Sequence, residues 1–211
     1  MIKTLLFAAA FALAIVSAKT LPDPLVDLPA AKGKQSIVLA GGCFWCTEAV
    51  FEHVIGVEKV VSGYAGGDAE SAVYEVVGSG RTNHAEAIEV VYDPNKITLG
   101  QILKVFFSVA HDPTQKDYQG PDHGRQYRSA IFYKTPDQKR IAEAYMKQLT
   151  DAKVFDKPIA TELAKLPAFF AAEGYHQDFV KHNPRHRYVV VNSIPKVEKL
   201  KAEFPQLYRE W

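Results

Sequence analysis

The segment SIVLAGGCFWCTE, residues Ser36–Glu48, changes from a strand pattern to a helix pattern at two glycines. Residues 36–40 are rich in aliphatic side chains and predict a strand, whereas residues 47–51 predict a helix. Cys43 therefore lies where the helix begins. Unpaired backbone N–H groups and the positive end of the helix dipole favour a thiolate there, so we expect the pKa of Cys43 to lie below the value of about 8.5 of an ordinary cysteine.

Cys46 follows Cys43 by three residues, which is about one helical turn, so the two sulfur atoms can meet with little change of the backbone. This spacing indicates redox chemistry. A purely structural disulfide is a weaker interpretation, because a bridge that closes so short a loop gains little stability in the chain-entropy model. A zinc site with two histidines is weaker still, since the pair with suitable spacing, His182 and His186, is interrupted by Pro184.

The 211-residue chain has 25 basic and 24 acidic side chains, so neither a nucleic acid nor an acidic membrane is expected as its main partner. Residues 1–18 are typical of a secretory signal peptide, with Lys3 ahead of an apolar run from Leu5 to Ala18. This run is shorter than the ~20 residues that span a bilayer, which argues against the alternative of an uncleaved anchor. We therefore expect cleavage, export to the periplasm and no stable membrane association afterwards.

Residues 19–35 contain several prolines and are interpreted as an extended lead-in, and residues 36–211 as one domain. After the first helix, apolar periodicity predicts further strands at residues 57–64, 85–92, 129–133 and 159–163. It predicts further helices at residues 99–109, with Thr98 as N-cap, at residues 136–149, and between residues 195 and 204. Two segments without a period, 68–83 and 111–128, predict long loops of the kind that carry binding sites.

The core elements follow the order strand, helix, strand, strand, helix, strand, which is typical of the ferredoxin-like fold. We predict an α+β two-layer sandwich with a mixed sheet, one helix and one strand appended, and a coil-rich C-terminal part. In this arrangement the helix start at Cys43 and the two long loops can come together at one end of the sheet.

Several motifs in collinear order, from about Ile37 to Pro184, resemble those of the A-type peptide methionine sulfoxide reductases. They are GCFW with a following Glu at residues 42–48, GYAGG at 63–67, HAEA at 84–87, DHGRQYRS at 122–129, and HQ at 176–177 ahead of NP at 183–184. The resemblance implies the reduction of methionine S-sulfoxide, free or in proteins, to methionine. It implies no metal and no organic cofactor.

The resemblance also implies roles for the reacting groups. Cys43 matches the nucleophile, which attacks the sulfoxide sulfur as a thiolate and is left as a sulfenic acid. Glu86 matches the acid, which protonates the sulfoxide oxygen from a site apolar enough to keep the carboxyl protonated. Without the resemblance, Glu86 would be interpreted as a surface residue paired with a lysine, as we expect for Glu89. Tyr74 and Tyr127 match two hydroxyls that hydrogen-bond the oxygen as charge develops on it.

Three further residues match the substrate pocket of the family. Phe44 and Trp45 correspond to a hydrophobic wall that receives the methyl group of the substrate, where a polarizable sulfur gains from contact with an aromatic ring. Ordinary burial in the core is the alternative for this pair. Asp122 matches a residue at the pocket.

The sequence departs from many family members at Cys46, a position where glycine is frequent, and in having no cysteine near the C-terminus, where other members keep resolving thiols. Because the chain has 2 cysteines, the resemblance implies that Cys46 resolves the sulfenic acid of Cys43. The resulting intramolecular disulfide would be reduced by a thioredoxin-like donor. Asn83 stands where glycine is frequent and affects local loop geometry alone.

Two other functions remain open. A general thiol-disulfide oxidoreductase of the exported compartment also has C-x-x-C at a helix start, but that function leaves Glu86, Tyr74 and Asp122 without a role. A secreted methionine-binding module is the non-enzymatic alternative, and the intact Cys43 argues against it. We expect a monomer.

Overall fold

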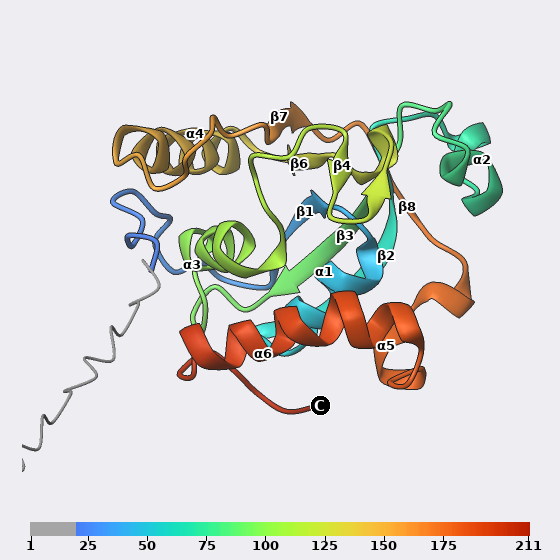
Figure 1. The fold of residues 1–211 in the computed structure, drawn as a ribbon. Helices are drawn as coiled ribbons and strands as arrows, with labels where there is room; N and C mark the ends of the chain where they lie inside the picture. Colours follow the sequence, from blue (N-terminus) through green and yellow to red (C-terminus); the bar gives the residue numbers. More distant parts are fainter. Residues whose placement is uncertain (1–19) are drawn as a thin grey trace, which may run out of the picture.

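The computed structural model describes residues 20–211, and the predicted signal segment 1–18 lies outside the described residues. A six-stranded sheet in the order β7-β6-β1-β3-β2-β8 forms the centre of the molecule (Figure 1). Its strands are β1 (Gln35–Gly41), β2 (Val57–Ala65), β3 (Ala85–Tyr92), β6 (Ser129–Tyr133), β7 (Glu162–Lys165) and β8 (Phe169–Ala171). A separate hairpin pairs β4 (Tyr118–Gln119) with β5 (Asp122–His123).

The α-helices are α1 (Phe44–Glu52), α2 (Tyr74–Gly78), α3 (Leu99–Val105), α4 (Pro136–Asp151), α5 (Phe179–His182) and α6 (Ile194–Glu203). Short 3-10 turns are η1 (Ala69–Ser71), η3 (Arg125–Tyr127) and η4 (Gly174–His176). The π-helical turn η2 (Phe106–Ala110) continues α3, and a second one, η5 (Val189–Ser193), leads into α6. Within residues 20–211, no helix has both the length and the apolar character needed to cross a membrane.

The strands β6, β1, β3 and β2 form the predicted ferredoxin-like core. β1 pairs antiparallel with β3 and with β6, and β3 pairs antiparallel with β2. α4 connects β6 to β7, and these two strands are parallel, so the sheet is mixed and the appended helix and strand lie at one edge. The predicted α+β fold is thus confirmed. At the other edge β8 pairs with β2 and adds a strand that the sequence pattern did not reveal.

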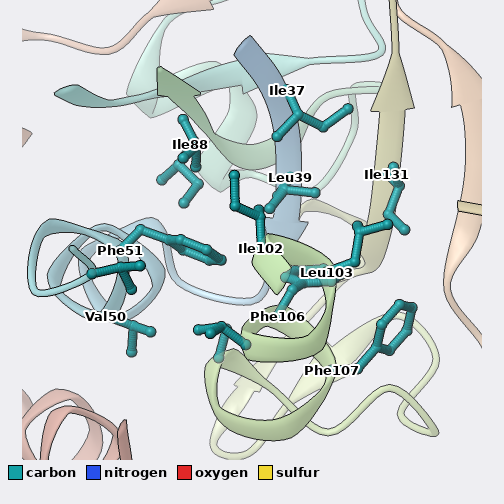
Figure 2. Packing of buried hydrophobic residues seen from close by; sticks show 14 of the residues in the cluster. Ile37, Leu39, Val50, Phe51, Ile88, Ile102, Leu103, Phe106, Phe107 and Ile131 are labelled. Carbon is teal, nitrogen blue, oxygen red and sulfur yellow. The ribbon is translucent and has the colours of Figure 1, made fainter. Parts of the chain in front are cut away.

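The two faces of the sheet follow from alternation along the strands. Ile37 and Leu39 of β1 point to the face that packs against α1, α3 and α4, and they belong to the main hydrophobic core (Figure 2). Val38 and Ala40 point to the opposite face, where small side chains lie under the segment 164–169. The helices therefore cover one face of the sheet. On β3, the side chain of Ile88 points to this face, and so does every second side chain from Ile88 along the strand.

The lead-in before β1 lies against α3 and α4. Asp27 accepts a hydrogen bond from the hydroxyl of Thr98, and Tyr145 on α4 donates one to the carbonyl of Pro22. Thr98 forms the predicted N-cap, as part of a capping box. These contacts attach residues 20–34 to the helical layer.

Some element boundaries differ from the predicted ones. The strand expected at 159–163 is found at Glu162–Lys165, because its parallel pairing with β6 fixes its position. The segment 68–83, expected as a loop, contains η1 and α2, and the segment 111–128 contains the β4–β5 hairpin and η3. Both segments are thus built around short elements, which hold side chains in fixed places.

Candidate active site

The turn between β1 and α1 places Cys43 at the N-cap of the helix, as the sequence predicts. Gly42 makes this turn possible. Its φ is +87°, a conformation that side chains disfavour, and a Cβ at this position would lie 2.6 Å from Cβ of Gln119. The close approach brings Cys43 beside the β4–β5 hairpin, and both border a cavity of about 80 Å³.

Cys43 and Cys46 form a buried pair of free thiols. Burial raises the pKa of Cys43 well above its ordinary value, and the neighbouring Cys46 and Glu86 add to this effect. Our expectation of a lowered pKa is therefore wrong, because desolvation of the thiolate outweighs the effect of the helix N-terminus. A hydrogen bond from Cys43 is the largest cause that lowers the pKa of Cys46, to about 6. The neighbouring Cys43 thus favours a thiolate at Cys46 over a thiolate at Cys43.

Glu86 lies on β3 and points to the helical face of the sheet, toward the start of α1. Its side chain is buried, and Oε2 accepts a hydrogen bond of 3.0 Å from the backbone N–H of Phe44. Burial raises the pKa of Glu86 to about 8, so the carboxyl is protonated at neutral pH. Glu89, three residues along the same strand, pairs with Lys134 at 2.5 Å, as expected for a residue on the other face. The structure thus separates the two carboxyls in the way that the sequence interpretation required.

Tyr74 and Tyr127 approach the same centre from two different loops. Tyr74 is the first residue of α2, and Tyr127 is the last residue of η3. Burial raises the pKa of both hydroxyls, and the nearby charges of Glu86 and Cys43 raise it further. Both side chains therefore stay neutral hydrogen-bond donors across the physiological range.

Buried polar contacts hold these two loops together. Gln126 of η3 donates a hydrogen bond of 3.3 Å to the carbonyl of Gly78 at the end of α2. Arg128 is buried and donates to the carbonyls of Asn83 and His84, just before β3. The two long loops thus meet at one end of the sheet, as predicted. The hydrogen bonds of the Arg128 guanidinium hold the loops in this position.

The two aromatic residues after Cys43 have different environments. Trp45 is half-buried, stacks on Phe179 with ring centroids 3.7 Å apart, and donates a hydrogen bond of 3.1 Å from Nε1 to Nδ1 of His176. Phe44 is 1% exposed and belongs to the main core. The expectation that both form an accessible wall is therefore corrected for Phe44, because the first turn of α1 directs its ring toward the sheet.

Asp122 lies at the edge of the cavity beside Cys43, where the sequence interpretation placed it. It is half-buried on β5, and Oδ2 accepts a hydrogen bond of 2.5 Å from the hydroxyl of Tyr188. Burial raises the pKa of this carboxyl. Within residues 20–211, no three His, Cys, Asp or Glu side chains are grouped so that they could hold a metal ion.

The family model described as peptide methionine sulfoxide reductase matches residues 35–208. This chain belongs to the peptide methionine sulfoxide reductase family. Its sequence is 54% identical over 185 residues to a peptide methionine sulfoxide reductase MsrA 2 of Mesorhizobium japonicum. The aligned region covers 88% of this chain and 95% of that protein. It is 52% identical over 190 residues to an MsrA 2 of Synechocystis, with 88% and 89% covered. The resemblance found in the sequence and the expectation of an enzyme of this family are both confirmed.

Solved structures of the family share the fold. The reduced form of Mxr1 from Saccharomyces cerevisiae is 32% identical and superposes with a TM-score of 0.65, covering 72% of this chain and 87% of that one. Methionine sulfoxide reductase A of Corynebacterium diphtheriae is 36% identical with a TM-score of 0.64, covering 74% and 78%.

The sequence interpretation did not identify Tyr188 as a residue of the candidate site of this reductase. Its hydroxyl reaches both Asp122 and the pair of cysteines, and the two thiols and burial all raise its pKa. The residue precedes three consecutive valines, a run that favours a strand, yet the chain forms the π-helical turn η5 there. No local pattern therefore indicated that Tyr188 faces the site.

Proposed function

We propose that this protein reduces the S epimer of methionine sulfoxide, in proteins and as the free amino acid, to methionine. The observation that carries the proposal is the position of a neutral, buried carboxyl, Glu86, at the start of the helix that Cys43 caps. Attack of a thiol on a sulfoxide needs a proton on the oxygen at the same time, because an unprotonated oxygen is a poor leaving group. Glu86 can supply that proton at neutral pH.

In the first step, Cys43 attacks the sulfoxide sulfur while its proton passes to the neighbouring Cys46 thiolate. Glu86 gives a proton to the oxygen, which transfers to the sulfur of Cys43. The products are methionine, the sulfenic acid of Cys43, the thiol of Cys46 and the carboxylate of Glu86. Atoms and charge balance, since the one negative charge moves from Cys46 to Glu86. The raised pKa of Cys43 is compatible with this step, because the proton acceptor Cys46 lies next to it on the first turn of α1.

The hydroxyls of Tyr74 and Tyr127 act as neutral donors to the oxygen while negative charge develops on it. Trp45 presents its exposed part to the methyl group of the substrate, and Phe44 supports the pocket from within the core. Asp122, fixed by Tyr188, sets the polar side of the same pocket.

In the second half of the cycle, Cys46 attacks the sulfenic acid and the enzyme is left with a Cys43–Cys46 disulfide. The backbone N–H of Cys46 donates to the carbonyl of Cys43 at 3.1 Å, so the two residues share the first turn of α1. A disulfide there borders the cavity, and a thioredoxin-like donor returns both cysteines to thiols.

Residues 1–18 direct the protein to the periplasm in this proposal, because their sequence has the charged start and apolar run of a secretory signal. The lead-in 19–35 and the single domain 36–211 are then what remains after cleavage, as a monomer. N-terminal sequencing of protein from a periplasmic fraction tests this part, and a chain that retains Met1 in the cytosol would contradict it.

The enzymatic proposal is tested with the separate S and R epimers of methionine sulfoxide and dithiothreitol as reductant. The wild type should consume the S epimer, whereas Cys43→Ser should form no methionine while keeping the same circular dichroism spectrum. Reduction of insulin disulfides in a parallel assay distinguishes the general oxidoreductase. Activity of Cys43→Ser, or disulfide reduction without methionine formation, would refute the proposal.

A further inference from the structure

Cys46 has a polar environment of its own, and two of the residues that form it, Ser193 and Lys196, have no part in the reduction of the sulfoxide. Its Sγ lies 3.2 Å from Oγ of Ser193 and 3.9 Å from the hydroxyl of Tyr188. Lys196 lines the same cavity, and its Nζ is held by a hydrogen bond of 2.7 Å to the carbonyl of Ala110. A hydroxyl donor, which Ser193 can supply, and a nearby cation stabilise a thiolate over a thiol, whereas the hydroxyl of Tyr188 donates its hydrogen to Asp122.

The π-helical turn η5 is what brings Ser193 to this place. Val189 at the start of the turn packs against Ala49 of α1, and Ser193 at its end is fully buried. Within residues 20–211, Oγ of Ser193 has one hydrogen-bond partner, which is Sγ of Cys46. A buried hydroxyl without a partner is costly, so the serine and the sulfur are held to each other.

We propose that Ser193 is a catalytic residue of the second half of the cycle and that, with Lys196, it holds Cys46 as the thiolate that resolves the sulfenic acid. This inference rests on the proposed function, since Cys46 must be the resolving thiol. A bond forms between the two sulfur atoms and the S–O bond of Cys43 breaks. The sulfur of Cys43 is reduced and that of Cys46 is oxidised. Cys46, which the first step leaves as a thiol, gives its proton to solvent, and solvent protonates Glu86 again. The oxygen then leaves as water after taking this proton from Glu86.

Ser193 and Lys196 become decisive after the first step. In the reduced enzyme, the largest contribution to the lowered pKa of Cys46 is the hydrogen bond from Cys43, and Lys196, Ser193 and Tyr188 add smaller ones. Oxidation of Cys43 removes its thiol hydrogen. Ser193 and Lys196 then stabilise the thiolate that forms when Cys46 loses its proton, at the moment when Cys46 has to attack.

The test follows the full-length protein after addition of one equivalent of methionine sulfoxide without reductant. Samples are quenched over time and analysed by mass spectrometry for sulfenic acid and disulfide, with methionine measured in the same samples so that the two steps are separated. Ser193→Ala should slow the conversion of sulfenic acid to disulfide about tenfold, as expected for the loss of one hydrogen bond to a charged group. Ser108→Ala is the matched control, because Ser108 is also a buried serine on a π-helical turn and its Oγ has no partner among residues 20–211.

A second variant keeps the test independent of any folding defect of Ser193→Ala. Lys196→Gln removes the cation beside Cys46 and should slow the same conversion. Lys199→Gln is its control. Lys199 also lies on α6 and donates a hydrogen bond to η2, in its case to the carbonyl of Ser108, but it does not line the cavity of Cys46.

A separate readout measures the thiolate directly. In a Cys43→Ser background, the pH dependence of alkylation of Cys46 by iodoacetamide gives its pKa, which should be higher when Ser193 is replaced by alanine. Unchanged disulfide formation in both Ser193→Ala and Lys196→Gln would overturn the inference while the proposed function stands. A wild type that accumulates sulfenic acid would overturn it together with the resolving role of Cys46.

Discussion

Oε2 of Glu86 accepts a hydrogen bond of 3.0 Å from the backbone N–H of Phe44, so the proposed proton donor is attached to the first residue of the helix that the proposed nucleophile caps. The contact satisfies one of the N–H groups that a helix start leaves unpaired. It also fixes the distance between acid and nucleophile through the backbone, independently of the loops that carry the tyrosines.

Replacement of Glu86 by glutamine should slow single-turnover formation of methionine by about 10²- to 10⁴-fold, the usual contribution of a general acid. The amide can still accept the hydrogen bond from Phe44, so the fold and substrate binding should change little. Glu89→Gln is the matched control, since Glu89 lies on the same strand but on the opposite face, paired with Lys134. A Glu86→Gln enzyme with the wild-type single-turnover rate would move the acid role to Tyr74 or Tyr127.

The first step should have a bell-shaped pH dependence. Below about pH 6 the pair of cysteines loses its negative charge, because the pKa of Cys46 is about 6, and the rate should fall with decreasing pH. Above about pH 8 Glu86 is ionised and no longer donates a proton, so the rate should fall again. Single-turnover rates between pH 5 and pH 9.5 measure both limbs, and Glu86→Gln should lack the alkaline one. A rate that keeps rising through pH 9 would show that ionisation of Cys43, and not the acid, limits the step.

Gly42→Ala should destabilise the protein by about 1–3 kcal/mol, since a side chain is strained at this φ and its Cβ would overlap Gln119. Because the same turn positions Cys43, activity should fall as well. Urea unfolding measures the free energy. Gly174→Ala is a suitable control, as a Cβ at Gly174 would have no atom within 4 Å. Equal stability of the two variants would mean that the β4–β5 hairpin moves away freely.

The sequence predicted the central strands well, because the alternation of apolar and polar side chains and the turn residues at the strand ends indicate the same bounds. Ser129–Tyr133 and Ala85–Tyr92 have the bounds expected from the pattern. The short edge strand β8 and the turn η5 were not predicted, since pairing with β2 and packing on α1 determine them, and neither is a local property.

The candidate site shows the same division. The motifs indicated Cys43, Glu86 and Asp122 as site residues, and the structure places the three near one another. The direction of the pKa shift of Cys43 was wrong, because the helix start is visible in the sequence whereas the burial of the thiol is not. Tyr188 was missed for the related reason that only the folded C-terminal part brings it to the cysteines.

After one turnover without reductant, the wild type should contain an intramolecular Cys43–Cys46 disulfide. The two residues share the first turn of α1, so the second thiol can attack the oxidised first with little change of the backbone. In mass spectrometry, the protein should lose two hydrogens. Cys46→Ser should instead gain one oxygen, because its sulfenic acid has no internal thiol to resolve it.

Cys46→Ser should also release one equivalent of methionine, more slowly than the wild type, since the serine is a poorer acceptor for the proton of Cys43. It should not turn over with thioredoxin, because that donor attacks disulfides more readily than it resolves a sulfenic acid. Steady turnover of Cys46→Ser with thioredoxin would show that the donor resolves Cys43 directly. Cys46 would then be left with a single role, that of proton acceptor in the first step.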